Sequence, residues 1–351
     1  MSGDNSKMDQ FLGKMVGDMG AAASAVLVLL GDKLGLYKAL GGNGSVTSAE
    51  LAQRTNTSER YVREWLAAQA AAGYVAYDSA SETFSMTPEQ KAVFADEDSP
   101  TNMTGGFYAL ASMFLDEPKI TAAFRTGKGV AWHEHSECLF CGTEKFFRPG
   151  YVANLIAEWI PALDGVKEKL ERGAKVADVG CGHGASTIVM AQAFPKSEFV
   201  GFDYHEPSVV RAREAAKEAG ADNITFEVAS AKTYPGENYD LVAVFDCLHD
   251  MGDPVGAAAH VLQSLHADGT WLIVEPFAHD TLEQNLNPVG RLFYSFSTMI
   301  CTPASKSQEV GLALGAQAGE ARLREVVMSG GFTRFRRATE TPFNLILEAR
   351  P

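Results

Sequence analysis

From residue 174 onward, short runs of β-branched and aromatic residues alternate with longer stretches of helical periodicity. Strands that alternate with helices are typical of a parallel sheet covered by helices. The pattern predicts seven strands in a doubly wound α/β fold. They are Lys175–Val179, Glu198–Asp203, Ile224–Val228, Leu241–Phe245, Thr270–Glu275, Thr333–Arg337 and Phe343–Glu348.

Residues 43–88 have a different pattern, that of a winged helix-turn-helix. One helix is expected over Ser48–Arg54, with its N-cap at Thr47 or Ser48, and a second over Glu59–Ala72, capped by Ser58 and ended by Gly73. Two alternating runs then predict the strands of a wing. These runs are Tyr74–Tyr77 and Thr83–Met86.

The second helix of this module lacks the basic stripe that reads DNA, because Arg60 and Arg63 are balanced by Glu59 and Glu64. Helices expected at 10–24 and 26–40 are rich in Ala, Leu and Met and would leave an apolar face uncovered in a single subunit. We therefore expect a winged-helix module that assembles a homodimer.

The apolar stretch Ala21–Leu30 is about ten residues long, too short to span a bilayer, and predicts a buried helix. Met1–Lys7 lacks the features of a secretory signal, so a cytoplasmic location is expected. Residues 95–170 read as a helical connector and active-site lid, with breaks at residues 105–106, 117–118, 127–129 and 149–150. The expected domains are thus 1–94, 95–170 and 171–351.

Composition agrees with two globular units: 351 residues, 46% of them hydrophobic and 21% charged. The net charge of −14 opposes binding to polyphosphates, so nucleic acid is an unlikely partner, and no membrane association is expected. Five cysteines are too few and odd in number for a disulfide framework, which favours reduced thiols.

The strongest local signal is the run from Asp178 through Gly180, Gly182 and Gly184, where a strand enters a glycine loop and then a helix. Such a loop lets the backbone approach a ligand closely. Asp203 ends the next strand about where a ribose would lie. The loop also satisfies the dinucleotide pattern, so an NAD or FAD enzyme is an alternative at this point.

Together these segments resemble the class I S-adenosylmethionine-dependent methyltransferases over residues 174–350. The preceding winged helix is similar to that of the dimeric small-molecule O-methyltransferases of plants and bacteria, including mycobacterial relatives. The resemblance implies S-adenosyl-L-methionine as the cofactor and a small-molecule methyl acceptor. It assigns the methionine part to Asp178 and the glycine loop, the ribose to Asp203, and the adenine to Tyr204. Ser230 stands where the family often has an acid, and Asp246 completes this set.

The segment from Asp246 to Pro254 resembles the His-Asp-Trp segment of these O-methyltransferases, with Met251 in place of Trp. In the family this histidine, here His249, is the general base, and Glu275 matches the acid that orients it. Proton removal from an attacking hydroxyl suits a group that titrates near neutrality. A second family acid is missing, and Gln317 is nearest to its place.

Two histidines and two cysteines crowd into nine residues, and their C-x₂-C spacing permits a metal knuckle. The crowding favours active-site lining instead, and no metal is assigned. These residues are His133, His135, Cys138 and Cys141. Just beyond them, Arg148 and Tyr151 are candidates to approach the cofactor carboxylate. The aromatic segment 293–301 lies where family members bind the acceptor.

The sequence thus predicts an enzyme that methylates an oxygen of a small molecule. S-methylation of a thiol, sulfide or thioether is the first alternative, and a thioether would need no base. A regulator that senses S-adenosylmethionine is a further alternative, which the acidic balance opposes.

Overall fold

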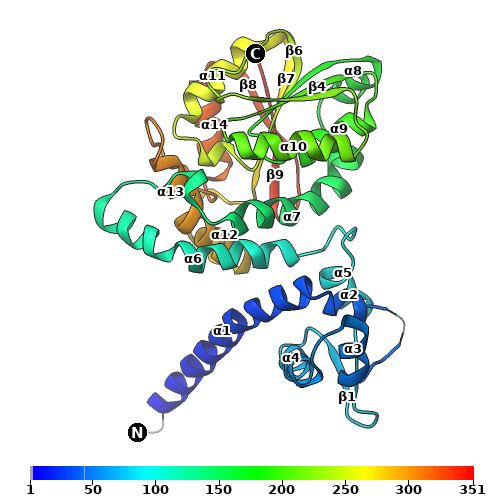
Figure 1. Cartoon of the computed structure of the whole chain (residues 1–351). Coiled ribbons are helices and arrows are strands. Elements are labelled where there is room, and N and C mark those ends of the chain that lie inside the picture. The colour runs from blue at the N-terminus through cyan, green and yellow to red at the C-terminus, as the bar shows by residue number, and fades with distance from the viewer. Residues whose placement is uncertain (1–2, 43) are drawn as a thin grey trace. The chain divides into compact units, whose positions relative to one another are not determined.

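The computed structural model describes residues 3–42 and 44–351 (Figure 1). The chain divides into two compact units. The first extends to Phe114 and includes Glu137–Pro149, and the second comprises Leu115–Ser136 and Gly150–Pro351. The segment 95–170, expected as a separate connector, is therefore shared between the two units.

The first unit contains the expected winged helix. Its elements are α1 (Gly3–Lys33), α2 (Leu36–Leu40), α3 (Ser48–Thr55), α4 (Glu59–Ala71), β1 (Ala76–Asp78), β2 (Thr83–Ser85) and α5 (Pro88–Phe94). Thr47 is the N-cap of α3, since its hydroxyl accepts from the Glu50 backbone N–H while its own N–H donates to the Glu50 carboxylate. Tyr37 stacks on Phe94 and meets Trp65 edge-on in the core of this module.

Helix α1 differs from the two helices expected at its place. It runs unbroken for 31 residues, because the glycines within it keep helical backbone and the first left-handed glycine, Gly35 with a φ of 67°, follows its end. The expectation of a short buried helix at Ala21–Leu30 is wrong, since half of these residues are exposed and only Ala25 and Val28 are buried. Within the described chain, Ser6–Lys33 is the one helical stretch whose length and composition suffice to cross a membrane, and 22% of its apolar window is buried.

Three of the expected chain breaks lie inside helices. Helix α6 (Thr104–Thr126) continues through residues 105–106 and 117–118, and α7 (Glu137–Asn154) continues through residues 149–150. The fourth break is where α6 ends, at Gly127 with φ 69°. Gly105 serves close packing, because a Cβ there would lie 2.3 Å from the backbone nitrogen of Phe146.

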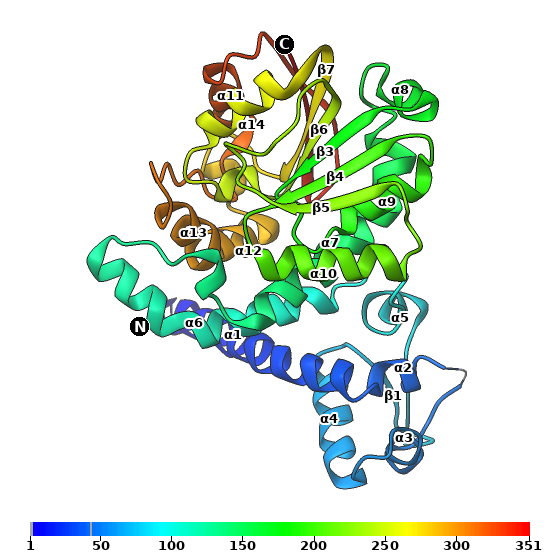
Figure 2. The same ribbon diagram turned by 45° about the horizontal axis from the view of Figure 1, so that its top comes forward.

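The second unit is built on a seven-stranded sheet of order β5-β4-β3-β6-β7-β9-β8 (Figure 2). Its strands are β3 (Lys175–Val179), β4 (Glu198–Asp203), β5 (Ile224–Val228), β6 (Tyr239–Phe245), β7 (Leu265–Pro276), β8 (Arg334–Glu340) and β9 (Asn344–Arg350). The expected α/β fold is confirmed, but the sheet is mixed rather than wholly parallel. Strand β9 runs antiparallel to both β7 and β8, since only a short turn joins it to β8.

Helices cover both faces of this sheet. Asp178 of β3 bonds to α9 (Ala185–Ala193), while its neighbours Ala177 and Val179 enter a core shared with α11 (Pro254–Ser264) and α14 (Gly319–Ser329). Successive residues of a strand point to opposite faces, so these helices lie on opposite sides. The remaining helical elements are η1 (Trp132–Glu134), η2 (Leu155–Trp159), α8 (Val166–Arg172), α10 (Glu206–Glu218), η3 (Leu248–Asp250), η4 (Glu283–Asn285), α12 (Pro288–Phe296), η5 (Ser297–Cys301) and α13 (Thr302–Lys306).

The close approach of α6 and α7 at Gly105 predicts a measurable stability difference. We expect Gly105→Ala to lower the free energy of unfolding by about 1–3 kcal/mol, since the added methyl group would force the two backbones apart. Gly13→Ala on α1 is the matched control, because its Cβ meets nothing within 4 Å and alanine favours the helix. Urea denaturation of both variants measures the difference. Equal stability of the two variants would contradict the packing argument.

Candidate functional site

The candidate site lies at the carboxyl edge of the parallel strands. Strand β3 ends in the glycine loop, where Gly180, Gly182 and Gly184 have φ values of 79°, 54° and 81°. A Cβ at Gly180 would strike Cys247, and one at Gly184 would strike Phe226, whereas one at Gly182 would point into open space. The loop is thus packed on two sides and open at Gly182, as a ligand cradle requires.

Asp203, at the end of β4, fastens this loop. Its carboxylate accepts hydrogen bonds from the backbone N–H groups of Gly182 at 2.9 Å and His205 at 2.8 Å. Burial raises its pKa. Of the neighbouring cofactor candidates, Tyr204 is about half exposed, and Ser230 is exposed and shares a hydrogen bond with Thr233.

Asp178 is fully buried beneath the loop. One carboxylate oxygen accepts hydrogen bonds from the hydroxyls of Ser186 and Thr187, each at 2.7 Å. The other, Oδ1, has no hydrogen-bond partner among the described residues. Burial raises the pKa of Asp178 to about 6, so an unmatched negative charge adjoins the cradle near neutral pH.

Asp246 follows β6 with a left-handed φ of 50°, which is unusual for a residue other than glycine. Its two carboxylate oxygens accept from the Tyr151 hydroxyl at 2.9 Å and the Asn344 amide at 3.1 Å. Burial, aided by the charge of Glu275, raises the pKa of Asp246 to about 8. Tyr151 therefore contacts another cofactor candidate, while its approach to the cofactor carboxylate stays a prediction, and Asn344 carried no sequence signal.

His249 and Glu275 meet between the ends of β6 and β7. The backbone N–H of Leu248 donates to Glu275 Oε1 at 2.9 Å, and His249 Nδ1 lies 2.5 Å from Oε2. Both side chains are buried. Burial alone would lower the pKa of His249, but the charges of Glu275 and Asp250 outweigh it and raise that pKa well above its usual value. A carboxylate on Nδ1 leaves Nε2 to face the site.

Two side chains that the sequence did not single out stand on the far side of this imidazole. Asp250 Oδ1 lies 3.2 Å from His249 Nε2, and the Cys301 thiol interacts with both residues. Cys301 is the last residue of the π-helical segment η5, a conformation often found at functional sites. Asp250 stood within the recognised motif, but nothing in the sequence linked Cys301 to it.

A second buried histidine also has a carboxylate on Nδ1. His135 Nδ1 lies 3.1 Å from Asp116 Oδ2, which also accepts from the Ser136 backbone N–H at 2.9 Å. Its Nε2 is buried without a hydrogen-bond partner in the described part of the chain. Within the second unit, the negative charge of Asp250 acts to raise the pKa of His135, although burial lowers that pKa overall.

The crowded His/Cys segment is split by the fold. His133 and His135 belong to the second unit, whereas Cys138 and Cys141 belong to the first. The four residues therefore do not form one cluster within either unit. Arg148 also belongs to the first unit, where its side chain is exposed, so its cofactor role stays a prediction.

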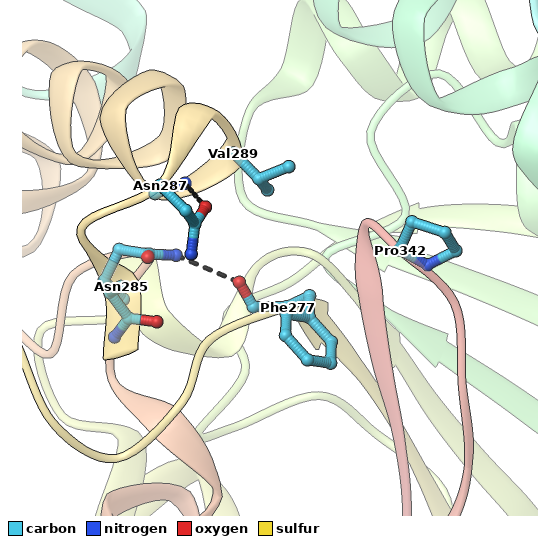
Figure 3. Close-up of a pocket in the computed structure, with 7 residues that line it drawn as sticks. Phe277, Asn285, Asn287, Val289 and Pro342 are labelled. Atoms are coloured by element: carbon cyan, nitrogen blue, oxygen red, sulfur yellow. Dashed lines mark hydrogen bonds between the residues drawn. The ribbon is translucent and has the colours of Figure 1, made fainter. Parts of the chain in front are cut away.

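A pocket opens beyond the end of β7, two residues past Glu275 (Figure 3). Gln317 lies here, its amide donating to the Phe277 carbonyl oxygen at 3.1 Å, while its buried Oε1 has no partner among the described residues. The lining comprises Phe277, Asn285, Asn287, Val289, Gly290, Gln317 and Pro342. None of the residues around His249 lines this pocket, and Gln317 does not complete the His249–Glu275 pair.

Family models match both parts of the chain. Residues 170–312 match a methyltransferase domain, and residues 22–95 match an Rv2258c-like winged helix-turn-helix domain. The chain thus combines a methyltransferase domain with a winged helix-turn-helix domain of the Rv2258c-like type. The recognition made from the glycine loop and the winged helix is thereby confirmed.

Solved methyltransferases share this architecture at low sequence identity. A Nostoc punctiforme protein assigned to the O-methyltransferases superposes with a TM-score of 0.72 at 20% identity, covering 96% of this chain and 98% of that one. Human N-acetylserotonin methyltransferase, solved in complex with S-adenosylmethionine, superposes with a TM-score of 0.69 at 16% identity, covering 97% of each chain. Similarity at this level establishes the fold of this methyltransferase.

Sequence relatives match less than half of this chain. A ubiquinone biosynthesis O-methyltransferase of Bordetella avium is 30% identical over 153 residues, which are 43% of this chain and 58% of the relative. The chain spans about half the length of the curated relatives it matches.

Proposed function

We propose that this methyltransferase moves a methyl group from S-adenosylmethionine to an oxygen of a small molecule, with His249 as general base. The observation that carries the proposal is the buried contact of 2.5 Å between His249 Nδ1 and Glu275, at the strand edge that also holds the glycine loop. The matched domain and the O-methyltransferase folds support the reaction class. Transfer to sulfur is the alternative.

The residues at the strand edge fit this cofactor. S-adenosylmethionine, when bound, supplies a methyl group on a positively charged sulfur and also carries an ammonium group. Asp178 offers a buried oxygen without a partner, and the loop is open at Gly182. Asp246 and Glu275 add further buried carboxylates, and none of these acids pairs with a lysine or arginine in the described part of the chain. The charge of Asp178, which has no partner at Oδ1, favours a cationic ligand.

Glu275 prepares His249 to accept a proton. It accepts from Leu248 as well as from His249, which fixes the carboxylate and holds the imidazole with Nε2 on the side of Asp250 and Cys301. Its charge also stabilises the imidazolium that forms when an acceptor hydroxyl gives up its proton. The chain thus contributes alignment, a buried environment and one proton acceptor.

A second copy of the chain is the proposed partner of α1. This helix exposes large apolar side chains at helical spacing along one face, among them Phe11, Val16 and Met19, which are 59%, 64% and 65% exposed. Apolar faces of this extent mark assembly surfaces, and a two-fold pair of identical helices would cover both.

Cofactor binding is tested by calorimetric titration with S-adenosylmethionine and NAD(H). We expect Asp203→Ala to weaken S-adenosylmethionine binding about ten- to a hundredfold, because a carboxylate hydrogen bond to the ribose is lost and the loop is released. The exposed Asp222→Ala is the control and should bind as the parent does. Binding of NAD(H) in place of S-adenosylmethionine would refute the proposed reaction.

The general base is tested with acceptors found by screening phenols, hydroxy acids and thiols. We expect His249→Ala to lower kcat/KM by about 10²–10⁴-fold while S-adenosylmethionine still binds. Since the pKa of His249 is raised, neutral imidazole accumulates only as pH increases, so parent kcat/KM should rise through an alkaline limb. Glu275→Gln removes the main charge that raises this pKa and should move the limb to lower pH. Retention of the rate in His249→Ala would instead indicate an acceptor that needs no base.

The dimer is tested by replacing Val16 of α1 with glutamate. We expect Val16→Glu to convert a dimer to monomers in analytical ultracentrifugation, since the charge would be buried in the paired face. Gln10→Glu, on the opposite side of the same helix, adds equal charge and should leave the dimer intact. A parent protein that sediments as a monomer at all concentrations would contradict the assignment.

A further inference from the structure

We propose that the side of His249 away from Glu275 is a binding site for a zinc-type divalent cation, formed by His249, Asp250 and Cys301. The imidazole Nε2, a carboxylate oxygen and the thiol sulfur all lie within 4.8 Å of one another. This site goes beyond the proposed methyl transfer and does not depend on it.

The spacing of two of these donors suits a single ion. His249 Nε2 and Asp250 Oδ1 are 3.2 Å apart. Two ligands on tetrahedral zinc, each bound at about 2.0–2.1 Å, are about 3.3 Å apart. Sulfur binds at a longer distance, so Cys301 is the natural third ligand at the outer edge of the group.

His249 Nε2 and Asp250 Oδ1 face one another and can hold a cation between them. When the imidazole is neutral and donates its Nδ1 proton to Glu275, a lone pair on Nε2 faces the carboxylate oxygen of Asp250. Two buried acceptors at 3.2 Å repel unless a proton or a metal ion lies between them. Apart from His249 and the Cys301 thiol, which also interacts with Asp250, no described residue donates to Asp250 Oδ1.

The contact on the far side of the imidazole is the one that metal-binding histidines make. A ligating histidine almost always donates its other N–H to a carboxylate, which fixes the ring and strengthens the ligand. Glu275 does this at 2.5 Å and is itself held by the Leu248 backbone N–H. Cys301, in turn, is placed by the π-helical turn of η5.

The donor set selects the kind of metal. Imidazole and thiolate ligands favour zinc and cobalt over magnesium and calcium, which prefer oxygen. Three protein ligands would leave a fourth position open for water or an added molecule. An ion on Nε2 would occupy the lone pair that a general base uses, so the metal-loaded chain and the chain that uses His249 as a base exclude one another.

The experiment is titration of the full-length, chelator-treated protein with Co²⁺, followed by absorption spectroscopy and metal analysis. We expect one Co²⁺ per chain, with the visible bands of four-coordinate cobalt and a near-ultraviolet thiolate charge-transfer band. Cys301→Ser should abolish the charge-transfer band, and Asp250→Asn should weaken binding at least tenfold. Glu275→Gln should weaken it about 10–100-fold through the orientation of His249.

Two controls make the outcome decisive. Cys141→Ser removes an exposed thiol of the crowded His/Cys segment and should leave the spectrum unchanged. Calorimetry with S-adenosylmethionine on each metal-free variant shows that it is folded, and it tests the methyltransferase proposal separately. The cation site is refuted if the folded parent binds no Co²⁺ at micromolar concentration, or if the thiolate band survives Cys301→Ser and disappears in Cys141→Ser.

Discussion

Buried negative charge at one edge of a sheet is the constraint around which this protein is organised. Parallel strands end at the same edge, so the acids at or next to the ends of β3, β4, β6 and β7 gather there. Each carboxylate needs donors to remain buried, and the chain supplies hydroxyls, backbone N–H groups, amides and a histidine. The hydrogen-bond donors are incomplete at Oδ1 of Asp178 and at Oδ1 of Asp250. A positively charged ligand would therefore stabilise these two carboxylates most.

The two proposals for His249 follow from one geometry. The imidazole is held between Glu275 on one nitrogen and Asp250 on the other, with Cys301 beside them. Whether a proton or a metal ion lies between His249 and Asp250 determines the chemistry that this histidine can perform. The fold presents the same Nε2 atom in either case.

Local pattern was enough to predict most of the second unit. Strands β3, β4 and β5 occupy the ranges expected from their β-branched runs, and the glycines of the expected ligand loop have positive φ. Three of the four expected helical breaks were wrong, and at the first of them glycine at residue 105 permits close packing and does not end the helix. Contacts between distant segments could not be predicted: Cys301 with His249, Asn344 with Asp246, and Asp116 with His135 depend on tertiary packing, which leaves no local signature.

The left-handed backbone at Asp246 has a consequence for how this chain can change over evolutionary time. A glycine there would relieve the left-handed φ of 50° and remove a buried acid. It would also leave the Tyr151 hydroxyl and the Asn344 amide without their acceptor, and a buried donor without a partner costs about 1–3 kcal/mol. Relief of the backbone and loss of buried hydrogen bonds therefore act in opposite directions on this one residue.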